Sequence, residues 1–111
     1  MTRIYKILSV TEWEAAQAEG VFTGSGVDVQ DGFIHFSTAA QVRETAAKHF
    51  AGRHDLLLVA VAGEALPIRW EPSRGGQLFP HLYQDLPLTA VKWTAPLPLG
   101  ANGRHEFPGL D

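Results

Sequence analysis

Two histidines lie inside segments that otherwise have the composition of a hydrophobic core. His35 stands in the stretch GFIHFST, and His81 stands in LFPHLY. An imidazole gains and loses a proton near neutral pH, and both of its ring nitrogens can form hydrogen bonds. The two histidines are therefore the first candidates for catalysis or ligand binding. The alternative is that each is a core histidine bonded to a backbone carbonyl, and the sequence leaves both interpretations open.

The segment around His35 has the composition of a strand. Side chains alternate between the two faces of a strand, so Phe33, His35 and Ser37 are expected on one face. Ile34 and Phe36 then point to the other face, toward the core. An imidazole and a hydroxyl two residues apart are well placed to hold one polar ligand.

The segment around His81 is constrained by a proline. Pro80 fixes its own backbone and biases Phe79 toward an extended conformation. In an extended segment Tyr83 shares a side with His81 and adds a phenol and an aromatic face. Alternatively, Phe79, Leu82 and Tyr83 simply pack a loop over the core.

The stretch WEPSRGG adds groups suited to an anion or a ribose. Gly75 and Gly76 allow backbone N–H groups to approach a ligand closely, and Arg74 can hold an anion bidentately. Ser73 adds a hydroxyl. Glu71 is a candidate general base, arginine partner or ligand to a ribose hydroxyl. The competing interpretation is a hairpin turn with an exposed arginine.

Other kinds of chemistry have little support. The chain has no cysteine, and its five histidines show neither HxH nor HExxH spacing. A zinc site made by His35, His81 and a carboxylate is a weak alternative, and no metal is predicted. No GxSxG motif indicates a serine nucleophile.

Length and composition predict one soluble cytosolic domain. The chain has 111 residues and a formal net charge of −3, which argues against bulk electrostatic binding to nucleic acid or anionic lipid. The longest apolar run, residues 56–62, is far shorter than the roughly 20 residues that span a bilayer. We therefore expect no membrane association.

The order of the elements predicts an α+β domain. A helix is expected after residue 9, with overlapping capping boxes at Ser9 and Thr11 and an end at Gly20. A second helix is expected over 39–50, capped by Thr38 and ended by Gly52. Residues 21–32 are expected to form a loop that can include a short strand. Residues 55–63, apolar on both faces, are expected to form a central strand. Further strands are expected at residues 3–8, 33–37, 66–72 and 88–97. Residues 73–83 are expected to form a turn that leads into a short extended segment. The fold class is α+β, with a small split or mixed sheet and two helices in the first half; residues 1–97 form the domain and 98–111 a coil tail.

Two long motifs resemble a known family. The stretches GSGVDVQDGFIHFST and WEPSRGGQLFPHLY, with IYKI near the start and a tryptophan in the first helix, are similar to the small bacterial proteins called domain of unknown function 952. The resemblance covers about residues 4–94. Gln84 stands where a glycine is expected after HLY.

The resemblance implies a fold like a minimal ADP-ribosyltransferase. Proteins of that superfamily bind NAD in the cleft of a split sheet, through a strand histidine followed by Ser or Thr, which HFS at 35–37 resembles. His81 or Tyr83 would support the nicotinamide, and Arg74 would hold phosphate. The late-strand catalytic glutamate of protein-modifying members has no clear match, since Glu71 comes in a different order.

We therefore predict a pocket for a nucleotide or another phosphorylated, NAD-like ligand, with ADP-ribosyl transfer or glycosidic cleavage as the reaction class. NAD is a candidate substrate, and no other cofactor is predicted. The alternative function is a non-catalytic ligand-sensing or protein-binding module. The candidate catalytic residues are His35, His81 and Glu71, and the candidate ligand-binding residues are Ser37, Ser73, Arg74, Gly75, Gly76 and Tyr83.

Overall fold

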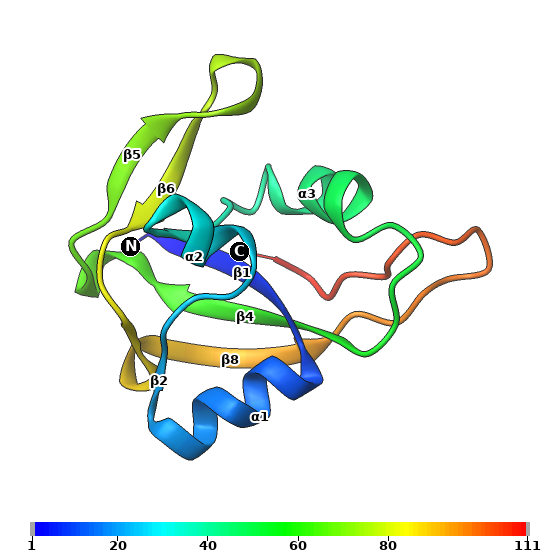
Figure 1. Cartoon of the computed structure of the whole chain (residues 1–111). Helices are drawn as coiled ribbons and strands as arrows, with labels where there is room; N and C mark the ends of the chain where they lie inside the picture. The colour runs from blue at the N-terminus through cyan, green and yellow to red at the C-terminus, as the bar shows by residue number, and fades with distance from the viewer. Residues whose placement is uncertain (1, 111) are drawn as a thin grey trace.

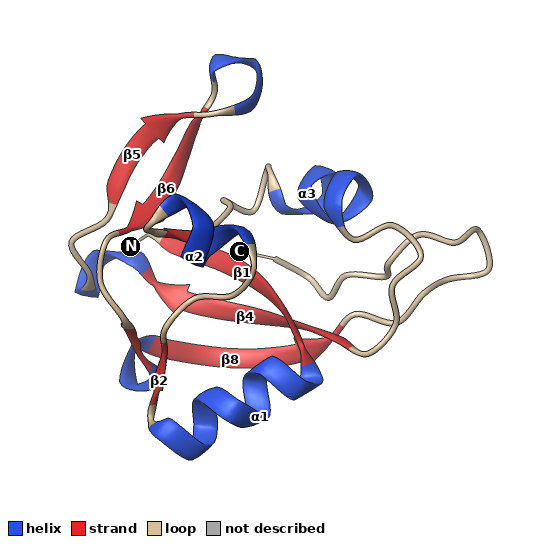
Figure 2. Ribbon diagram, in the orientation of Figure 1, coloured by secondary structure: helices blue, strands red, loops and turns tan. Residues whose placement is uncertain are grey.

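The chain folds into three α-helices and three small antiparallel sheets (Figures 1 and 2). This architecture is seen in a computed structural model that describes residues 2–110, apart from the Arg74 side chain. The α+β class is confirmed. The expected mixed sheet is wrong, because every strand pair in the described part of the chain is antiparallel.

The largest sheet forms the centre of the molecule. Its three strands are ordered β1 (Arg3–Ser9), β4 (Leu56–Ala62) and β8 (Val91–Pro96). The middle strand β4 is buried along almost its whole length, which confirms the expectation from its apolar sequence. Its side chains alternate between two hydrophobic cores: Val59 and Val61 pack on one side, and Leu58 and Ala60 pack on the other.

The two longer helices cover opposite sides of this sheet. Helix α1 (Val10–Glu19) contributes Ala16 to the first core, and helix α3 (Val42–His49) contributes Val42 and Ala46 to the second. Figure 2 shows the two helices on either side of the central strands. Each helix therefore buries its apolar face against a different surface of β4.

Helix α1 begins with the capping box that the sequence offered at Ser9. The Glu12 backbone N–H donates to Ser9 Oγ at 3.0 Å, and the Ser9 N–H donates to Glu12 Oε1 at 2.9 Å. Gly20 ends the helix in the left-handed conformation, with φ of 82°. The competing cap at Thr11 lies inside the helix.

We expect Ser9→Ala to lower the free energy of unfolding by about 1 kcal/mol, because the first turn of the helix depends on this box. The matched control is Thr11→Ala, which removes an exposed hydroxyl from the same turn and should change stability by less than about 0.5 kcal/mol. Chemical denaturation of the two variants measures the difference. Equal losses of stability in the two variants would mean that the capping box does not stabilise the protein.

The third sheet carries the histidines. Its order is β3 (Ile34–His35), β6 (Leu78–Leu82) and β5 (Arg69–Pro72), so β5 is an edge strand. The β5–β6 hairpin projects away from the central sheet (Figure 1). A separate two-stranded sheet joins β2 (Val21–Phe22) to β7 (Leu86–Pro87). Short 3₁₀ turns lie at Gly63–Ala65, Arg74–Gly76 and Leu88–Ala90.

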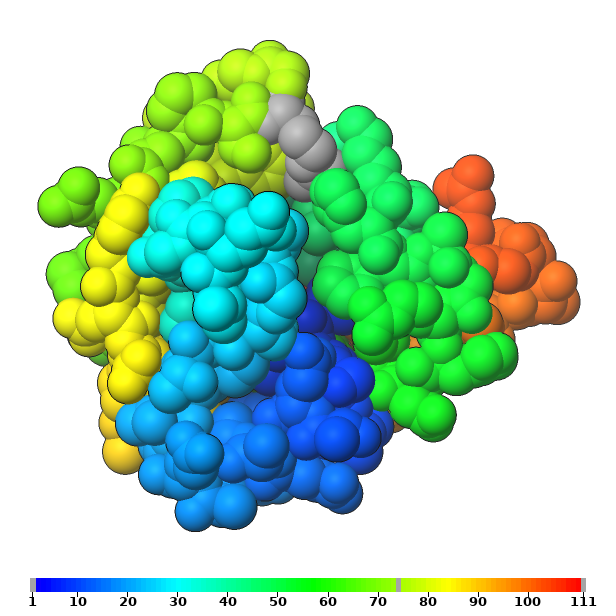
Figure 3. Space-filling model, in the orientation of Figure 1, coloured from blue at the N-terminus to red at the C-terminus, as the bar shows by residue number. Residues whose placement is uncertain are grey.

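The expected loop at residues 21–32 contains a helix, which corrects the prediction of two helices. Helix α2 (Val27–Asp31) has only five residues, and Gly32 ends it in the left-handed conformation, with φ of 84°. Gly24 has φ of 103° and lies close to Asp28, so a side chain there would be strained. Figure 3 shows this segment (cyan) on the surface, between the N-terminal part of the chain and the β5–β6 hairpin. The glycines that suggested a loop are the residues that bend the chain into and out of this turn of helix.

Helix α3 is shorter than the expected 39–50. Residues 38–41 form a turn, in which the Thr38 N–H donates to Gln41 Oε1 at 3.0 Å. The helix then begins at Val42 and ends at His49, three residues before Gly52. The Thr38 side chain makes no capping bond to this helix, because it lies a full turn before it.

The C-terminal segment folds back along α3. Leu97 belongs to the second core, and Phe107 and Leu110 pack against that core. A bridge between Leu99 and His105 closes a turn. No helix within residues 2–110 is long and apolar enough to cross a bilayer.

Candidate functional site

The pairing of β3 with β6 places the two histidines side by side. His35 lies directly opposite His81 in the register, although the two are 46 positions apart in the chain. Their ring centroids are 5.3 Å apart and the rings meet edge to face. Two imidazoles from distant motifs therefore form one cluster.

A phenylalanine lies at the centre of this cluster. The ring centroid of Phe33 is 4.6 Å from that of His35, 4.2 Å from that of His81 and 4.9 Å from that of Tyr83. We call these four rings the aromatic face. Tyr83 is exposed at its rim, whereas His81 is only 4% exposed. The face is therefore continuous from the surface to the buried imidazole.

Each ring nitrogen of His35 contacts a carboxylate of helix α2. Nδ1 lies 2.6 Å from Asp28 Oδ1, and Nε2 lies 3.0 Å from Asp31 Oδ2. An ionised carboxylate only accepts hydrogen bonds. Each ring nitrogen can therefore donate to its carboxylate only when it carries a proton.

Asp28 connects three parts of the fold. The residue is 3% exposed, and its carboxylate accepts from Lys6 Nζ on β1 at 2.7 Å and from the His35 N–H at 3.0 Å. The Ser25 N–H also donates to it, at 3.2 Å. The carboxylate therefore ties the central sheet, α2 and β3 together.

The charges around Asp28 decide its protonation. Burial opposes ionisation of Asp28, but the hydrogen bond from His35 and the charge of Lys6 outweigh it, so the pKa of the carboxyl lies below its usual value. For Lys6 the balance is reversed: burial lowers the pKa of the ammonium more than Asp28 raises it. The pair is therefore a buried ion pair with a strong desolvation cost.

His81 has a carboxylate partner of its own. Its Nδ1 lies 2.8 Å from Glu71 Oε1 on β5, and the Tyr83 hydroxyl donates to the same oxygen at 2.7 Å. The hydrogen bonds from His81 and Tyr83 lower the pKa of Glu71, and the bond to Glu71 raises the pKa of Tyr83. Among the residues that the structure describes, His81 Nε2 has no hydrogen-bond partner.

This arrangement can move a proton. A carboxylate that holds Nδ1–H of a histidine fixes the tautomer and leaves Nε2 as the basic atom. Glu71 can play this part for His81. It lies on the same face of the sheet as His81, two residues along β5 from Arg69, the residue directly opposite His81. Arg69, which lies directly opposite His81 in the register, also has its guanidinium carbon 4.9 Å from the centre of the Tyr83 ring. The cluster thus combines an acid–base pair, an aromatic surface and a cation.

The structure brings four of the predicted residues together, namely His35, His81, Glu71 and Tyr83. Ser37 lies elsewhere: its backbone pairs with Tyr5 of β1 and its hydroxyl lies 2.9 Å from Thr45 Oγ1 of α3. The strand alternation expected over 33–37 ends at His35, because β3 has only two residues.

The predicted phosphate loop lies at the tip of the β5–β6 hairpin. Ser73, Gly75 and Gly76 follow Pro72, which pairs with Leu78 three residues along from the histidine row. At about 3.3 Å per residue this is roughly 10 Å from the imidazoles. The Gly76 N–H donates to the Ser73 carbonyl at 2.9 Å, so that donor closes the turn. The Arg74 side chain lies outside the described part of the structure.

Sequence reasoning missed the charged residues that hold His35. Asp28, Asp31 and Lys6 were not predicted as site residues, and Phe33 was noted only for its face of the strand. No usable signal was present in the sequence: in VDVQD the aspartate alternates with valines, yet in the structure Val27 and Val29 are exposed and Asp28 is buried.

The described chain has hollows away from the aromatic face. One of about 380 Å³ lies between α3 and the C-terminal segment, and one of about 120 Å³ lies beside α1. Neither is lined by His35 or His81, so the common cavity expected from the sequence is not one of them. Within residues 2–110 no three His, Asp or Glu side chains are grouped so as to hold a metal ion.

The chain matches a known protein family over most of its length. Residues 7–94 match the family described as "Protein of unknown function (DUF952)", and the chain belongs to this family. A crystal structure of protein CC0527 from Caulobacter crescentus is 52% identical over 95% of this chain and 94% of its own, with a TM-score of 0.91. The solution structure of CC0527 is 54% identical over 94% of this chain and 91% of its own, with a TM-score of 0.82. A comparison with curated proteins finds no match.

Proposed function

We propose that the aromatic face binds a nucleotide or another phosphorylated, NAD-like ligand. The observation that supports this most is the cluster of Phe33, His35, His81 and Tyr83, in which planar rings adjoin carboxylates. A nucleobase stacks on such rings, and carboxylates at the rim accept hydrogen bonds from ribose hydroxyls. As part of this proposal we infer that the fold resembles that of the ADP-ribosyltransferases, as the sequence motifs imply.

In this proposal each group has a distinct role. The base stacks at the exposed end of the face, against Phe33 and Tyr83, and Asp31 or Glu71 holds a ribose hydroxyl. Arg69, whose guanidinium lies over the Tyr83 ring, would contact a phosphate of the ligand. The hairpin tip, with Ser73, Gly75, Gly76 and Arg74, would contact the far end of an extended ligand.

If the ligand is turned over, the reaction is cleavage of its N-glycosidic bond. Water attacks the anomeric carbon of NAD and His81 Nε2 takes a proton from that water. Nicotinamide leaves as a neutral molecule with the electron pair of the broken bond. Glu71 stabilises the imidazolium that forms, through Nδ1. With an acceptor hydroxyl in place of water, the same step is ADP-ribosyl transfer.

The experiment is calorimetric titration of NAD and of ADP-ribose into the wild type and into Phe33→Leu. We expect saturable binding that weakens about tenfold in Phe33→Leu, because base–aromatic stacking contributes about 1–3 kcal/mol per base. The matched control is Phe50→Leu, which changes a phenylalanine at the end of α3 and should bind as the wild type does.

Absence of saturable binding at millimolar ligand, with a folded wild type, would contradict the proposal, and so would equal binding by the two variants. Chromatography after incubation with NAD then separates the two functional classes. Release of nicotinamide that is lost in His81→Asn indicates an enzyme. Binding without release indicates a ligand-sensing module.

A further inference from the structure

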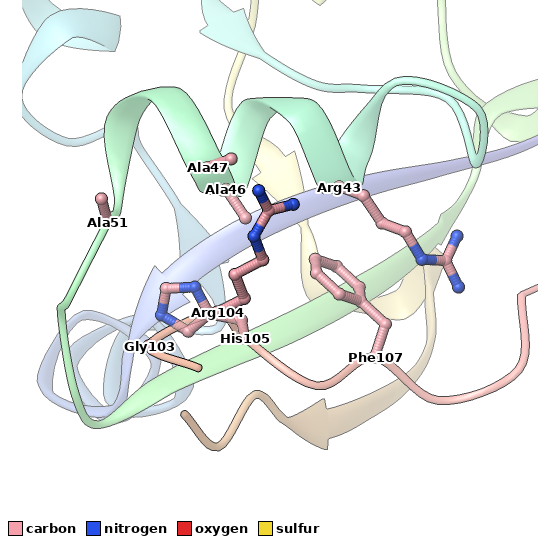
Figure 4. A pocket seen from close by; sticks show the side chains of 8 residues that line it. All are labelled: Arg43, Ala46, Ala47, Ala51, Gly103, Arg104, His105 and Phe107. Atoms are coloured by element: carbon pink, nitrogen blue, oxygen red, sulfur yellow. The ribbon is translucent and has the colours of Figure 1, made fainter. Parts of the chain in front are cut away.

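A hollow away from the aromatic face, between α3 and the C-terminal segment, has the features of a second site. Its volume is about 380 Å³, which is within the range of small-molecule pockets. Figure 4 shows helix α3 on one side and the returning chain on the other. The lining residues are Arg43, Ala46, Ala47, Ala51, Arg104 and Phe107, with Gly103 and His105.

The walls of this hollow are held in place. Phe107 packs against the second hydrophobic core, to which Ala46 belongs. His105 Nε2 donates to the backbone carbonyl of Arg53 at 2.8 Å, and the backbone of His105 bridges to Leu99. The C-terminal segment is thus fastened to the loop that follows α3, and the hollow is a feature of the packed fold.

The charge of the hollow is opposite to that of the chain. The net charge of the protein is −3, yet the lining includes two guanidiniums, and no carboxylate belongs to its described lining. Neither Arg43 nor Arg104 has an ion-pair partner among residues 2–110. Unpaired cations beside a hollow attract an anion.

The two guanidiniums lie along an apolar wall. The guanidinium carbon of Arg43 is 5.2 Å from the centre of the Phe107 ring. Figure 4 shows Arg104 reaching toward Ala46 and Ala47, with the Phe107 ring between the two arginines. The floor is therefore suited to a flat apolar body, and the arginines are suited to its charged group.

We propose that this hollow binds a small organic anion, with a carboxylate or phosphate group on Arg43 or Arg104 and an apolar body against the alanines and Phe107. The site is separate from the aromatic face and does not depend on the function proposed for it. Arg104, His105 and Phe107 lie outside residues 7–94, so the site belongs to chains that carry this C-terminal segment.

The test uses three small probes and follows their binding by NMR chemical shifts of the protein. Phenyl phosphate and benzoate carry the two kinds of anionic group, and benzyl alcohol is the uncharged control. We expect saturable shifts at Phe107 and His105 with at least one anion, and at least tenfold weaker binding of the alcohol. At least one of Arg43→Gln and Arg104→Gln should weaken anion binding about tenfold, since a hydrogen bond to a charged group contributes about 1.5–3 kcal/mol.

The matched control is Lys92→Gln, which removes an exposed cation from β8 and should leave the affinity unchanged. All three side chains are exposed, so the variants should stay folded. The proposal is overturned if neither anion saturates, if the alcohol binds as well, or if Lys92→Gln weakens binding as much as the arginine variants. It is also overturned if the shifts map to Phe33 and Tyr83, because the probe then occupies the aromatic face.

Discussion

Asp28→Asn should lower the free energy of unfolding by about 3 kcal/mol, the largest effect we expect from a polar substitution, because removing one partner of a buried ion pair leaves the other charge uncompensated. Lys6, with its side chain 11% exposed, would then face an uncharged amide. That amide has a single acceptor oxygen, so it cannot match the donors of Lys6 and His35 together. Urea denaturation followed by circular dichroism measures the loss.

Two comparisons make this prediction specific. Asp31→Asn removes the more exposed carboxylate from the same imidazole and should cost less than about 1 kcal/mol. Adding Lys6→Met to Asp28→Asn should restore part of the stability, because no unpaired ammonium remains. If Lys6→Met lowers the stability of Asp28→Asn as much as it lowers that of the wild type, the two side chains are not coupled and the ion pair is not the cause.

The pH dependence of stability gives a second measurement on the same variant. The pKa of Asp28 is lower in the folded protein than in the unfolded chain. Its contribution is therefore complete above the unfolded value of about 3.9, and is lost as the pH falls through the folded pKa. The difference in stability between the wild type and Asp28→Asn should shrink as the pH falls below about 4. A difference that stays constant from neutral to acid pH would exclude this carboxylate as its source.

Leu58→Ala should lower the free energy of unfolding by about 2–5 kcal/mol, because the cavity left in a packed core adds to the lost burial. Leu58 is 0% exposed in the middle strand of the central sheet. Leu78→Ala makes the same chemical change on the hairpin, where the side chain is 53% exposed, and should cost less than about 1 kcal/mol. Thermal and urea unfolding of both variants test the contrast, and equal losses would contradict the assignment of Leu58 to the core.

Local signals predicted the parts of the fold that depend on neighbouring residues. The capping box of Ser9 and Glu12 and the left-handed Gly20 are recognisable from a few letters of sequence, and the apolar run of β4 marks a strand buried on both faces. Helix α2 was missed because a helix of five residues between glycines is stabilised by its contacts, which local propensity does not contain.

The site was predicted in part for the same reason. His35 and His81 could be selected because imidazoles are unusual in apolar strands, and the structure pairs them. Their carboxylate partners come from other elements: Asp28 from α2 and Glu71 from β5. That Lys6 on β1 reaches Asp28 depends on how separate sheets pack, which no pattern along one strand shows. The roles of Ser73, Arg74, Gly75 and Gly76 stay predictions.

The edge position of β5 has a consequence for how the protein behaves at high concentration. An unpaired strand edge is a template to which a strand of another molecule can add, and this is a route to aggregation. Here that edge is only four residues long, ends in Pro72, which has no N–H to donate, and carries the opposite charges of Arg69 and Glu71. The same short, charged strand that supports His81 therefore also protects the molecule against edge-to-edge association of its sheet with that of another molecule.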